Sequence, residues 1–282
     1  MNTPGVLSPT ATRSLLDRLG VQPSRRLGQN FLVDGNIVRK SLELARVAAG
    51  DRIVEIGPGL GTLTSALLDA GAEVYAIELD PTLAAYLREE LAGKYSKTVH
   101  LCEGDAVERP LGSLPESAGN SFKIVANLPY AISSLWLERV LAGALPERVV
   151  LMLQGETARR YLAEPGSKAF GAISVFLQAA YAVEPGHPVA RSCFFPVPEV
   201  DSVLLNLVRR EQPYVFSRRS RGIIRELFQQ RRKQLGPLLR RRNVTGAGEW
   251  LETWSGLGIR PDARAEIIPV AAWIDFDRLL NA

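Results

Sequence analysis

The sequence has little cysteine. Only Cys102 and Cys193 occur among its 282 residues. Two cysteines are too few for a disulfide framework, and their separation does not match the close pairs that bind metals. We therefore predict a cytoplasmic protein without a metal site.

Long apolar runs are also missing. No run approaches the roughly 20 apolar residues that a membrane-spanning helix needs. Residues 1–13 have neither the apolar core of a signal peptide nor the Arg-rich amphipathic pattern of a transit peptide. We expect neither a membrane anchor nor a targeting segment.

Positive charge is unevenly distributed. The net charge is only +4, yet residues 218–242 hold ten Lys and Arg side chains and one acid, Glu226. The rest of the chain is therefore mildly acidic. This asymmetry favours a patch that faces a polyanion, and a solvated helix face is the alternative interpretation.

Strand and helix patterns alternate between residues 50 and 210. Strand patterns cover residues 52–56, 73–77, 97–102, 122–126 and 149–153, and helical patterns cover residues 62–70 and 81–91. Asp80 is a suitable N-cap for the second helix, with Pro81 in its first turn. The alternation predicts an α/β fold, a Rossmann-like and mainly parallel sheet with helices on both faces. Residues 203–208 suit an edge or closing strand.

The pattern changes after residue 209. Residues 221–242, 249–257 and 270–281 have helical patterns, and we see no strand pattern among them. We predict a large domain over residues 1–211, with an N-terminal segment over residues 1–49. A small all-helical domain follows over residues 212–282.

Three features at predicted strand ends indicate a cofactor site. Gly57-Pro58-Gly59-Leu60-Gly61 forms a glycine turn between a strand and a helix, and Thr62 stands where a dinucleotide fingerprint needs glycine. Glu78 ends the next strand, where a carboxylate can bind ribose hydroxyls. Asp105 follows the strand after that and could accept a hydrogen bond from an adenine amine. The three could merely terminate strands, but their common register favours one binding edge.

Asn127-Leu128-Pro129-Tyr130 follows the fourth strand pattern. The Asn127 side-chain oxygen and the Leu128 carbonyl can each accept an N–H from an exocyclic adenine amine, which would align its lone pair for displacement. Pro129 stiffens the turn, and the Tyr130 ring offers a stacking surface. An ordinary Asn-x-Pro turn is the alternative, and the strand-end position favours function.

Phe194 begins a proline-rich run that ends at Asp201-Ser202. Phenylalanines are more often core residues. In a loop stiffened by proline, however, Phe194 could sandwich a flipped base against Tyr130.

A further motif, Arg26-Leu27-Gly28-Gln29-Asn30-Phe31-Leu32-Val33-Asp34, precedes the others. After it come, in this order, the glycine turn, Glu78, Gly104-Asp105, the run from Asn127 to Tyr130 and the proline-rich run. Together they resemble the bacterial small-subunit ribosomal RNA adenine N6,N6-dimethyltransferases, relatives of the macrolide-resistance and mitochondrial adenine dimethyltransferases. The resemblance extends from about Thr12 to the C-terminus and is strongest through residue 208. Phe228-Gln229-Gln230-Arg231-Arg232-Lys233-Gln234-Leu235 continues it.

The resemblance implies a class I methyltransferase sheet and S-adenosyl-L-methionine as cofactor. It places Asn30 and Leu32 beside Gly57, Glu78, Asp105 and Asn127 in the cofactor site. The implied target is two adjacent adenines in a hairpin near the 3′ end of 16S rRNA, each methylated twice within the immature 30S subunit. A monomer is implied as well.

In this scheme the helical domain contacts RNA, and we expect Arg231, Arg232 and Lys233 to bind it. Two positions depart from the family pattern. Gly155 stands where a basic residue is usual, and Ala172 where Arg is common. Both departures predict weaker affinity for RNA.

Three other functions stay open at this stage. One is a ribosome-assembly or RNA-binding factor without catalysis, which the intact Glu78, Asp105 and Asn127 disfavour. Another is a DNA adenine or protein glutamine methyltransferase, which usually has proline at the position of Leu128. The third is a large-subunit methyltransferase of the resistance type. The run Pro165-Gly166-Ser167-Lys168 favours the small-subunit branch by resemblance.

Overall fold

The computed structural model describes residues 6–24, 28–244 and 246–281. The chain divides into two compact units. The larger unit comprises Met1–Val140, Ala144–Ala158 and Val183–Arg209, and the smaller unit comprises Leu141–Gly143, Arg159–Ala182 and Arg210–Ala282. The smaller unit therefore includes residues 159–182 as well as the C-terminal helices. The domain boundary at residue 211 stays a prediction.

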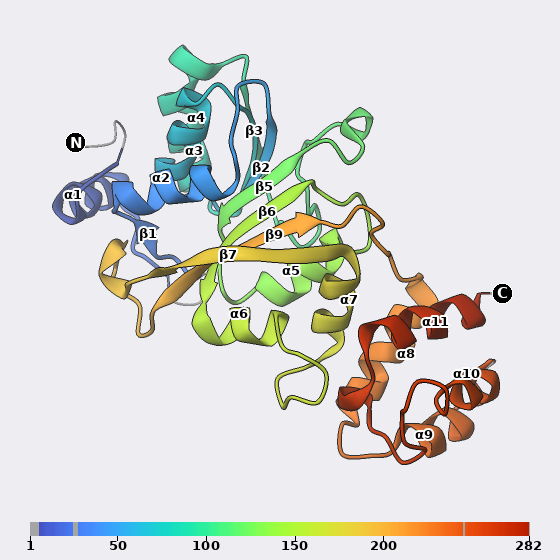
Figure 1. The fold of residues 1–282 in the computed structure, drawn as a ribbon. Helices are drawn as coiled ribbons and strands as arrows, with labels where there is room; N and C mark the ends of the chain where they lie inside the picture. The colour runs from blue at the N-terminus through green and yellow to red at the C-terminus, as the bar shows by residue number, and fades with distance from the viewer. Residues whose placement is uncertain (1–5, 25–27, 245, 282) are drawn as a thin grey trace. The chain divides into compact units, whose positions relative to one another are not determined.

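The strands of the larger unit belong to a seven-stranded sheet (Figure 1), in the order β4-β3-β2-β5-β6-β9-β7. Its strands are β2 (Arg52–Ile56), β3 (Glu73–Glu78), β4 (Val99–Glu103), β5 (Lys123–Asn127), β6 (Arg148–Gln154), β7 (Tyr181–Val189) and β9 (Ser202–Arg209). The strands from β2 to β6 pair in parallel, and β9 pairs with β6 in the antiparallel sense. The predicted Rossmann-like α/β class is confirmed.

Helices cover both faces of this sheet. One face packs against α2 (Gly35–Leu44), α3 (Thr62–Asp69) and α4 (Pro81–Tyr95), where Val38, Leu67 and Leu87 share a core with Val74 and Val125. Figure 1 shows α5 (Ser133–Val140) on the opposite face. As predicted, the Asp80 carboxylate caps α4 by accepting hydrogen bonds from two backbone N–H groups of its first turn.

The N-terminal segment contributes α1 (Pro9–Leu19) and a short strand, β1 (Phe31–Leu32). The latter pairs antiparallel with β8 (Phe194–Phe195). This pairing joins two segments that lie far apart in the sequence, and a periodicity search does not detect strands of two residues.

Residues 203–208 form a strand as predicted, but of the two alternatives, an edge or a closing strand, the edge position is wrong. Strand β9 lies between β6 and β7, and β7 forms the edge. The sequence of β7 contains Pro185, Gly186 and Pro188, which hide its strand character because proline and glycine are rare in strands. An edge position tolerates proline, which cannot donate a ladder hydrogen bond. Gly186 is required by close packing, since a Cβ there would lie 2.2 Å from the Leu204 carbonyl oxygen.

The smaller unit is helical. It contains part of α6 (Gly155–Tyr161), α7 (Ala172–Ala180), α8 (Arg218–Gln229), α9 (Leu235–Arg241), α10 (Ala247–Thr253) and α11 (Val270–Leu280). Trp250, Trp273 and Phe276 form its aromatic core, with ring centroids 4.6 to 5.7 Å apart. No strand occurs among the described residues after 212, as the sequence predicts. In the same described ranges, no helix is both long and apolar enough to cross a membrane.

The single helix predicted over residues 221–242 is wrong. Helix α8 ends at Gln229, and α9 begins at Leu235. Between them, Gln234 forms an isolated antiparallel bridge with Arg264, and the Leu235 amide donates to the Ala263 carbonyl at 2.9 Å. These backbone pairs with a distant segment replace helical hydrogen bonds, so tertiary pairing outweighs the local helix preference.

A buried carboxylate ties α8 to α11. Asp277 is 3% exposed. Its oxygens accept from the Tyr214 hydroxyl at 2.7 Å, the Ser217 hydroxyl at 2.7 Å and the Asn281 amide at 2.8 Å. Burial by itself would raise the pKa of Asp277, but the hydrogen bonds from Ser220, Ser217 and Tyr214 outweigh it and lower that pKa. Asp277 is therefore an ionised, well-satisfied anchor.

Candidate active site

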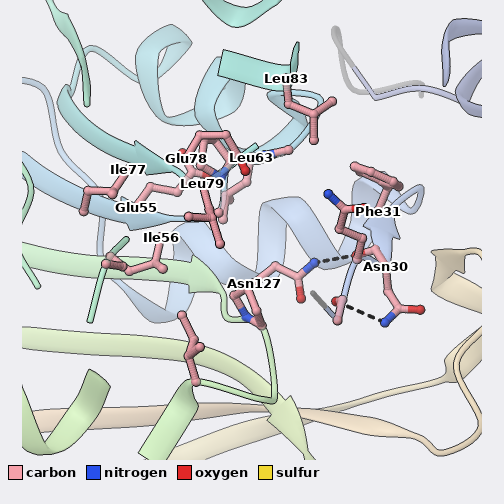
Figure 2. A pocket seen from close by; sticks show the side chains of 18 of the residues that line it. Asn30, Phe31, Glu55, Ile56, Leu63, Ile77, Glu78, Leu79, Leu83 and Asn127 are labelled. Atoms are coloured by element: carbon pink, nitrogen blue, oxygen red, sulfur yellow. Dashed lines mark hydrogen bonds between the residues drawn. The ribbon is translucent and has the colours of Figure 1, made fainter. Parts of the chain in front are cut away.

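A pocket lies in the larger unit at the carboxyl ends of four parallel strands (Figure 2). These strands are adjacent in the order β4-β3-β2-β5, so the residues that follow them stand along one edge. The pocket is lined in that order by Asp105, Glu78, Gly57 and Asn127. The structure thus brings these four residues to one sheet edge, as the sequence predicts, and doubly wound sheets bind ligands at this edge.

The N-terminal segment forms another wall of this pocket. Asn30, Phe31 and Leu32 line it. Backbone pairing with β8 and a hydrogen bond from the Val33 amide to the Cys193 carbonyl, at 2.9 Å, hold the segment in place. Arg26 and Leu27, which begin the same motif, lie outside the described residues.

The glycine turn needs its glycines. Gly59 has a φ of +60°, and a Cβ at this position would come within 3.1 Å of the Phe31 ring. Its amide donates to Glu78 Oε2 at 3.0 Å. The turn therefore packs tightly against the N-terminal segment and exposes backbone to the pocket.

Glu78 is held from both sides. Its second oxygen, Oε1, accepts from the Asp80 amide at 3.0 Å, and the residue is 5% exposed. Burial raises the pKa of this carboxyl. Because each carboxylate oxygen has two lone pairs, Glu78 can still accept hydrogen bonds from a ligand while its position is fixed.

Glu55 is a site residue that the sequence analysis missed. It lies in β2, lines the pocket (Figure 2) and is 2% exposed. Among the described residues, its Oε2 is buried without a hydrogen-bond partner. Burial raises the pKa of Glu55 to about 8. With that pKa the carboxyl is mostly protonated at neutral pH, so Glu55 is a neutral hydrogen-bonding group at the pocket wall. The sequence offers one signal for Glu55: it is a glutamate within an apolar strand that ends at the glycine turn.

The Asn127 amide is oriented by the N-terminal segment. Its Nδ2 donates to the Asn30 carbonyl oxygen at 2.9 Å, as the dashed line in Figure 2 shows. In the part of the chain that the structure describes, no hydrogen bond occupies Asn127 Oδ1. The acceptor that an amine substrate needs is therefore available at the pocket wall.

The other residues predicted to act on the substrate, Leu128, Tyr130 and Phe194, are not among those that line the pocket. Leu128 is 1% exposed, so its side chain is buried. Tyr130 shares a hydrogen bond of 2.8 Å with the Ser202 hydroxyl. Neither residue is among those that line the pocket, although Pro129 and Ala131 are. Phe194 is 1% exposed and packs in the core with Val38 and Leu67, because its strand pairs with β1. The structure does not bring its ring into the pocket.

The three predicted RNA-binding residues lie in the smaller unit, between α8 and α9. Arg231 is paired with Glu266, at 2.8 Å from Nη2 and 3.2 Å from Nε to Oε2. Arg232 and Lys233 are exposed. Within the described ranges, no three His, Cys, Asp or Glu side chains gather in a way that could hold a metal ion.

Comparison with known proteins identifies the chain's relatives. The family model described as ribosomal RNA adenine dimethylase matches residues 21–281. The chain belongs to this family.

A relative from Opitutus terrae (strain DSM 11246 / JCM 15787 / PB90-1), named ribosomal RNA small subunit methyltransferase A, is 61% identical over 95% of this chain and 96% of its own length. The crystal structure of a dimethyladenosine transferase from Plasmodium falciparum has a TM-score of 0.72 at 23% identity, covering 88% of this chain and 98% of that one. The structure of 23S rRNA methyltransferase ErmE has a TM-score of 0.66 at 25% identity, covering 90% and 100%.

This dimethylase-family protein is therefore an rRNA methyltransferase that depends on S-adenosylmethionine. The pocket fits that cofactor in its chemistry. Glu78 offers fixed carboxylate oxygens for hydroxyl groups. Apolar walls from Ile56, Ile77, Leu79 and Leu83 suit a flat heteroaromatic ring.

Proposed function

We propose that the protein dimethylates the N6 amines of two adjacent adenosines in a hairpin near the 3′ end of 16S rRNA. The substrate would be the immature 30S subunit in the cytoplasm, and the enzyme would act as a monomer. The single observation that carries the adenine chemistry is the orientation of Asn127, whose amide nitrogen is held by Asn30 while its oxygen is left for an amine.

The choice of the small subunit is supported by similarity. The relative that is 61% identical carries a small-subunit name, whereas the 23S enzyme ErmE matches at 25% identity. This difference favours the small-subunit branch over the resistance-type branch.

We assign the cofactor to the pocket edge. Glu78 would accept from ribose hydroxyls, Asp105 from the adenine amine, and Gly57 would let the backbone approach closely. Asn30, Leu32 and Asn127 would complete the site. Asp105 Oδ1 already accepts from the Val107 amide at 2.7 Å, which fixes its direction.

The bound cofactor supplies a methyl group on a positively charged sulfur. The work of the protein is to hold the adenine amine. An exocyclic amine is a weak nucleophile because its lone pair is delocalised into the ring. When Asn127 Oδ1 and the Leu128 carbonyl each accept one N–H, the lone pair is directed away from both acceptors. No strong base is needed for this alignment.

The Tyr130 ring would support the flipped base. Its hydroxyl is anchored by Ser202, which is 4% exposed, so the ring direction is fixed by the same proline-rich run that contains Phe194. The stacking role of Phe194 stays a prediction, and it requires a ring that now packs in the core to face the substrate.

Methyl transfer to isolated ribosomal subunits tests this proposal. Purified protein and labelled S-adenosylmethionine would be mixed with 30S subunits that lack the modification, with 50S subunits and DNA as controls. We expect label on 30S alone, recovered as N6,N6-dimethyladenosine after digestion. Label on 50S would move the protein to the resistance-type branch. Cofactor binding without any transfer would favour an assembly factor.

A further inference from the structure

The Gln29 side chain joins two distant parts of the larger unit. Its amide nitrogen, Nε2, donates to Asp80 Oδ2 at 3.4 Å, across 51 positions of the sequence. Its amide oxygen, Oε1, accepts from the Ser24 backbone N–H at 2.8 Å. Because a backbone N–H can only donate, this second bond fixes which end of the amide faces the carboxylate. The contact therefore has a defined direction, from the amide donor to the carboxylate acceptor.

Asp80 connects this contact to the part of the pocket edge that holds Glu78. Its backbone N–H donates to Glu78 Oε1 at 3.0 Å. Its Oδ1 accepts from the backbone amides of Thr82 and Leu83, which caps α4. The other carboxylate oxygen, Oδ2, is the one that meets Gln29. Gln29 is thus bound to the residue that both orients Glu78 and begins α4.

The residues on either side of Gln29 reach the opposite end of the pocket. The Asn30 carbonyl oxygen accepts from the Asn127 amide at 2.9 Å. Gly28 has a φ of +65°, and a Cβ there would lie 3.4 Å from the backbone nitrogen of Tyr130. The backbone around Gln29 therefore packs directly against the turn that carries Asn127.

An apolar cluster brings the same segments together. It comprises Leu15, Leu16, Phe31, Leu60 and Leu83. Leu60 belongs to the glycine turn and Leu83 to the first turn of α4, and both line the pocket. Apolar packing of this kind is not directional, whereas a hydrogen bond is. The Gln29 contact is therefore suited to set how the N-terminal segment is aligned with α4.

We propose that Gln29 is a positioning residue that couples the two ends of the pocket. Through Asp80 it acts on Glu78, and through the backbone of Asn30 it acts on Asn127. Cofactor affinity and the rate of methyl transfer then depend on one shared contact. The part of this inference that concerns Asn127 rests on the proposed function.

Exchanging the two partners tests the contact. In Gln29→Glu a carboxylate faces the Asp80 carboxylate, and in Asp80→Asn an amide faces the Gln29 amide, so each single change removes the bond. The double variant restores it in the reverse direction, from an amide donor at position 80 to a carboxylate acceptor at position 29. The Ser24 N–H keeps its acceptor throughout, and asparagine caps α4 about as well as aspartate does.

We expect each single variant to raise the Kd for S-adenosylmethionine about 3- to 10-fold, the equivalent of one ordinary hydrogen bond. The single-turnover rate of methyl transfer, at saturating cofactor and saturating 30S subunits, should fall by a similar factor. The double variant should return to within about 2-fold of the wild type in both quantities, because the two changes are not independent. Isothermal titration calorimetry would give the Kd.

Gln22→Glu is the matched control. Gln22 is exposed in the same N-terminal segment and is not among the residues that line the pocket. The substitution makes the same change in charge and should leave affinity and rate unaltered. Circular dichroism checks that every variant is folded. If Gln29→Glu does not fold, the double variant must still bind the cofactor more tightly than Asp80→Asn.

The outcomes are distinct. Losses in the two single variants that multiply in the double variant would overturn the inference, because the two side chains would then act independently. Unchanged affinity and rate in folded Gln29→Glu would overturn it as well. A change in affinity without a change in transfer rate would overturn the coupling. The expected pattern of Kd values in a protein that transfers no methyl group to 30S would overturn the proposed function and leave the cofactor part intact.

Discussion

Asn127 lies where the N-terminal segment meets the sheet edge, and its amide is fixed by one hydrogen bond to the Asn30 carbonyl. We expect Asn127→Ala to lower kcat by on the order of 100-fold or more, because the amine loses its alignment. Cofactor affinity should fall by less than about 10-fold, the equivalent of one ordinary hydrogen bond. Single-turnover methyl transfer and equilibrium dialysis would measure the two effects.

The matched control is Asn36→Ala, an exposed asparagine in the first turn of α2 that does not line the pocket. It should retain full transfer. If Asn127→Ala turned over at the wild-type rate, the amide would have no part in holding the amine.

The raised pKa of Glu55 predicts how the free energy of unfolding depends on pH. Its pKa is about 8 in the folded protein, whereas a glutamate in an unfolded chain titrates near about 4.3. When the pH lies between these two pKa values, Glu55 is ionised in the unfolded chain but protonated in the folded protein. The free energy of unfolding contributed by Glu55 therefore falls as pH rises through this window.

Glu55→Gln removes this titration. Its stability relative to the wild type should increase from pH 5 to pH 9, as urea denaturation in the absence of cofactor would show. A difference between the two proteins that stays constant across this range would contradict the buried, protonated carboxyl.

The site residues differ in how far the neighbouring sequence alone predicts their position. Glu78, Asp105 and Asn127 were predictable because each follows an apolar strand, and parallel strands bring their carboxyl ends together. Glu55 has the same strand signal, but only the structure shows that it lines the pocket with a buried oxygen that has no hydrogen-bond partner among the described residues. The burial of Phe194 depends on pairing between β1 and β8, which no local pattern encodes.

At the scale of elements, Asp277 joins the start of α8 to α11. Asp277→Asn should lower the free energy of unfolding by about 2 kcal/mol or more, since it removes charged hydrogen bonds in a buried site. Because the folded-state pKa of Asp277 is lowered, its contribution is complete above the unfolded pKa of about 3.9 and is lost as pH falls through the lower folded value.

Tryptophan fluorescence measures this prediction, because Trp250, Trp254 and Trp273 lie in the smaller unit and only Trp136 lies in the larger one. Asp275→Asn on the exposed side of α11 is the control, as the half-exposed Asp275 side chain pairs with Arg278 at 3.2 Å. Equal destabilisation of both variants near neutral pH would refute the anchoring role of Asp277.

The elements differ in how predictable they were. The strands of the parallel half were predicted to within a few residues because buried strands are nearly continuous apolar runs. Strand β7 was missed because Pro185 and Pro188 mask it. The break between α8 and α9 was missed because it depends on the distant partners Ala263 and Arg264.

At the scale of the whole molecule, the chain separates two tasks. The larger unit carries the acidic pocket with Glu55, Glu78 and Asp105, and the smaller unit carries the basic segment. The charge asymmetry in the sequence anticipated this separation. It did not reveal which cations are committed to ion pairs, as Arg231 is to Glu266 and Arg242 is to Glu226.

The most direct test of the central claim is nucleoside mapping of rRNA from a bacterium that lacks its own enzyme of this family and expresses this chain. The account predicts two adjacent N6,N6-dimethyladenosines near the 3′ end of 16S rRNA with the wild-type protein, and none with Asn127→Ala expressed at the same level. Unmodified 16S rRNA in the presence of folded wild-type protein, or modification found on 23S rRNA instead, would contradict it.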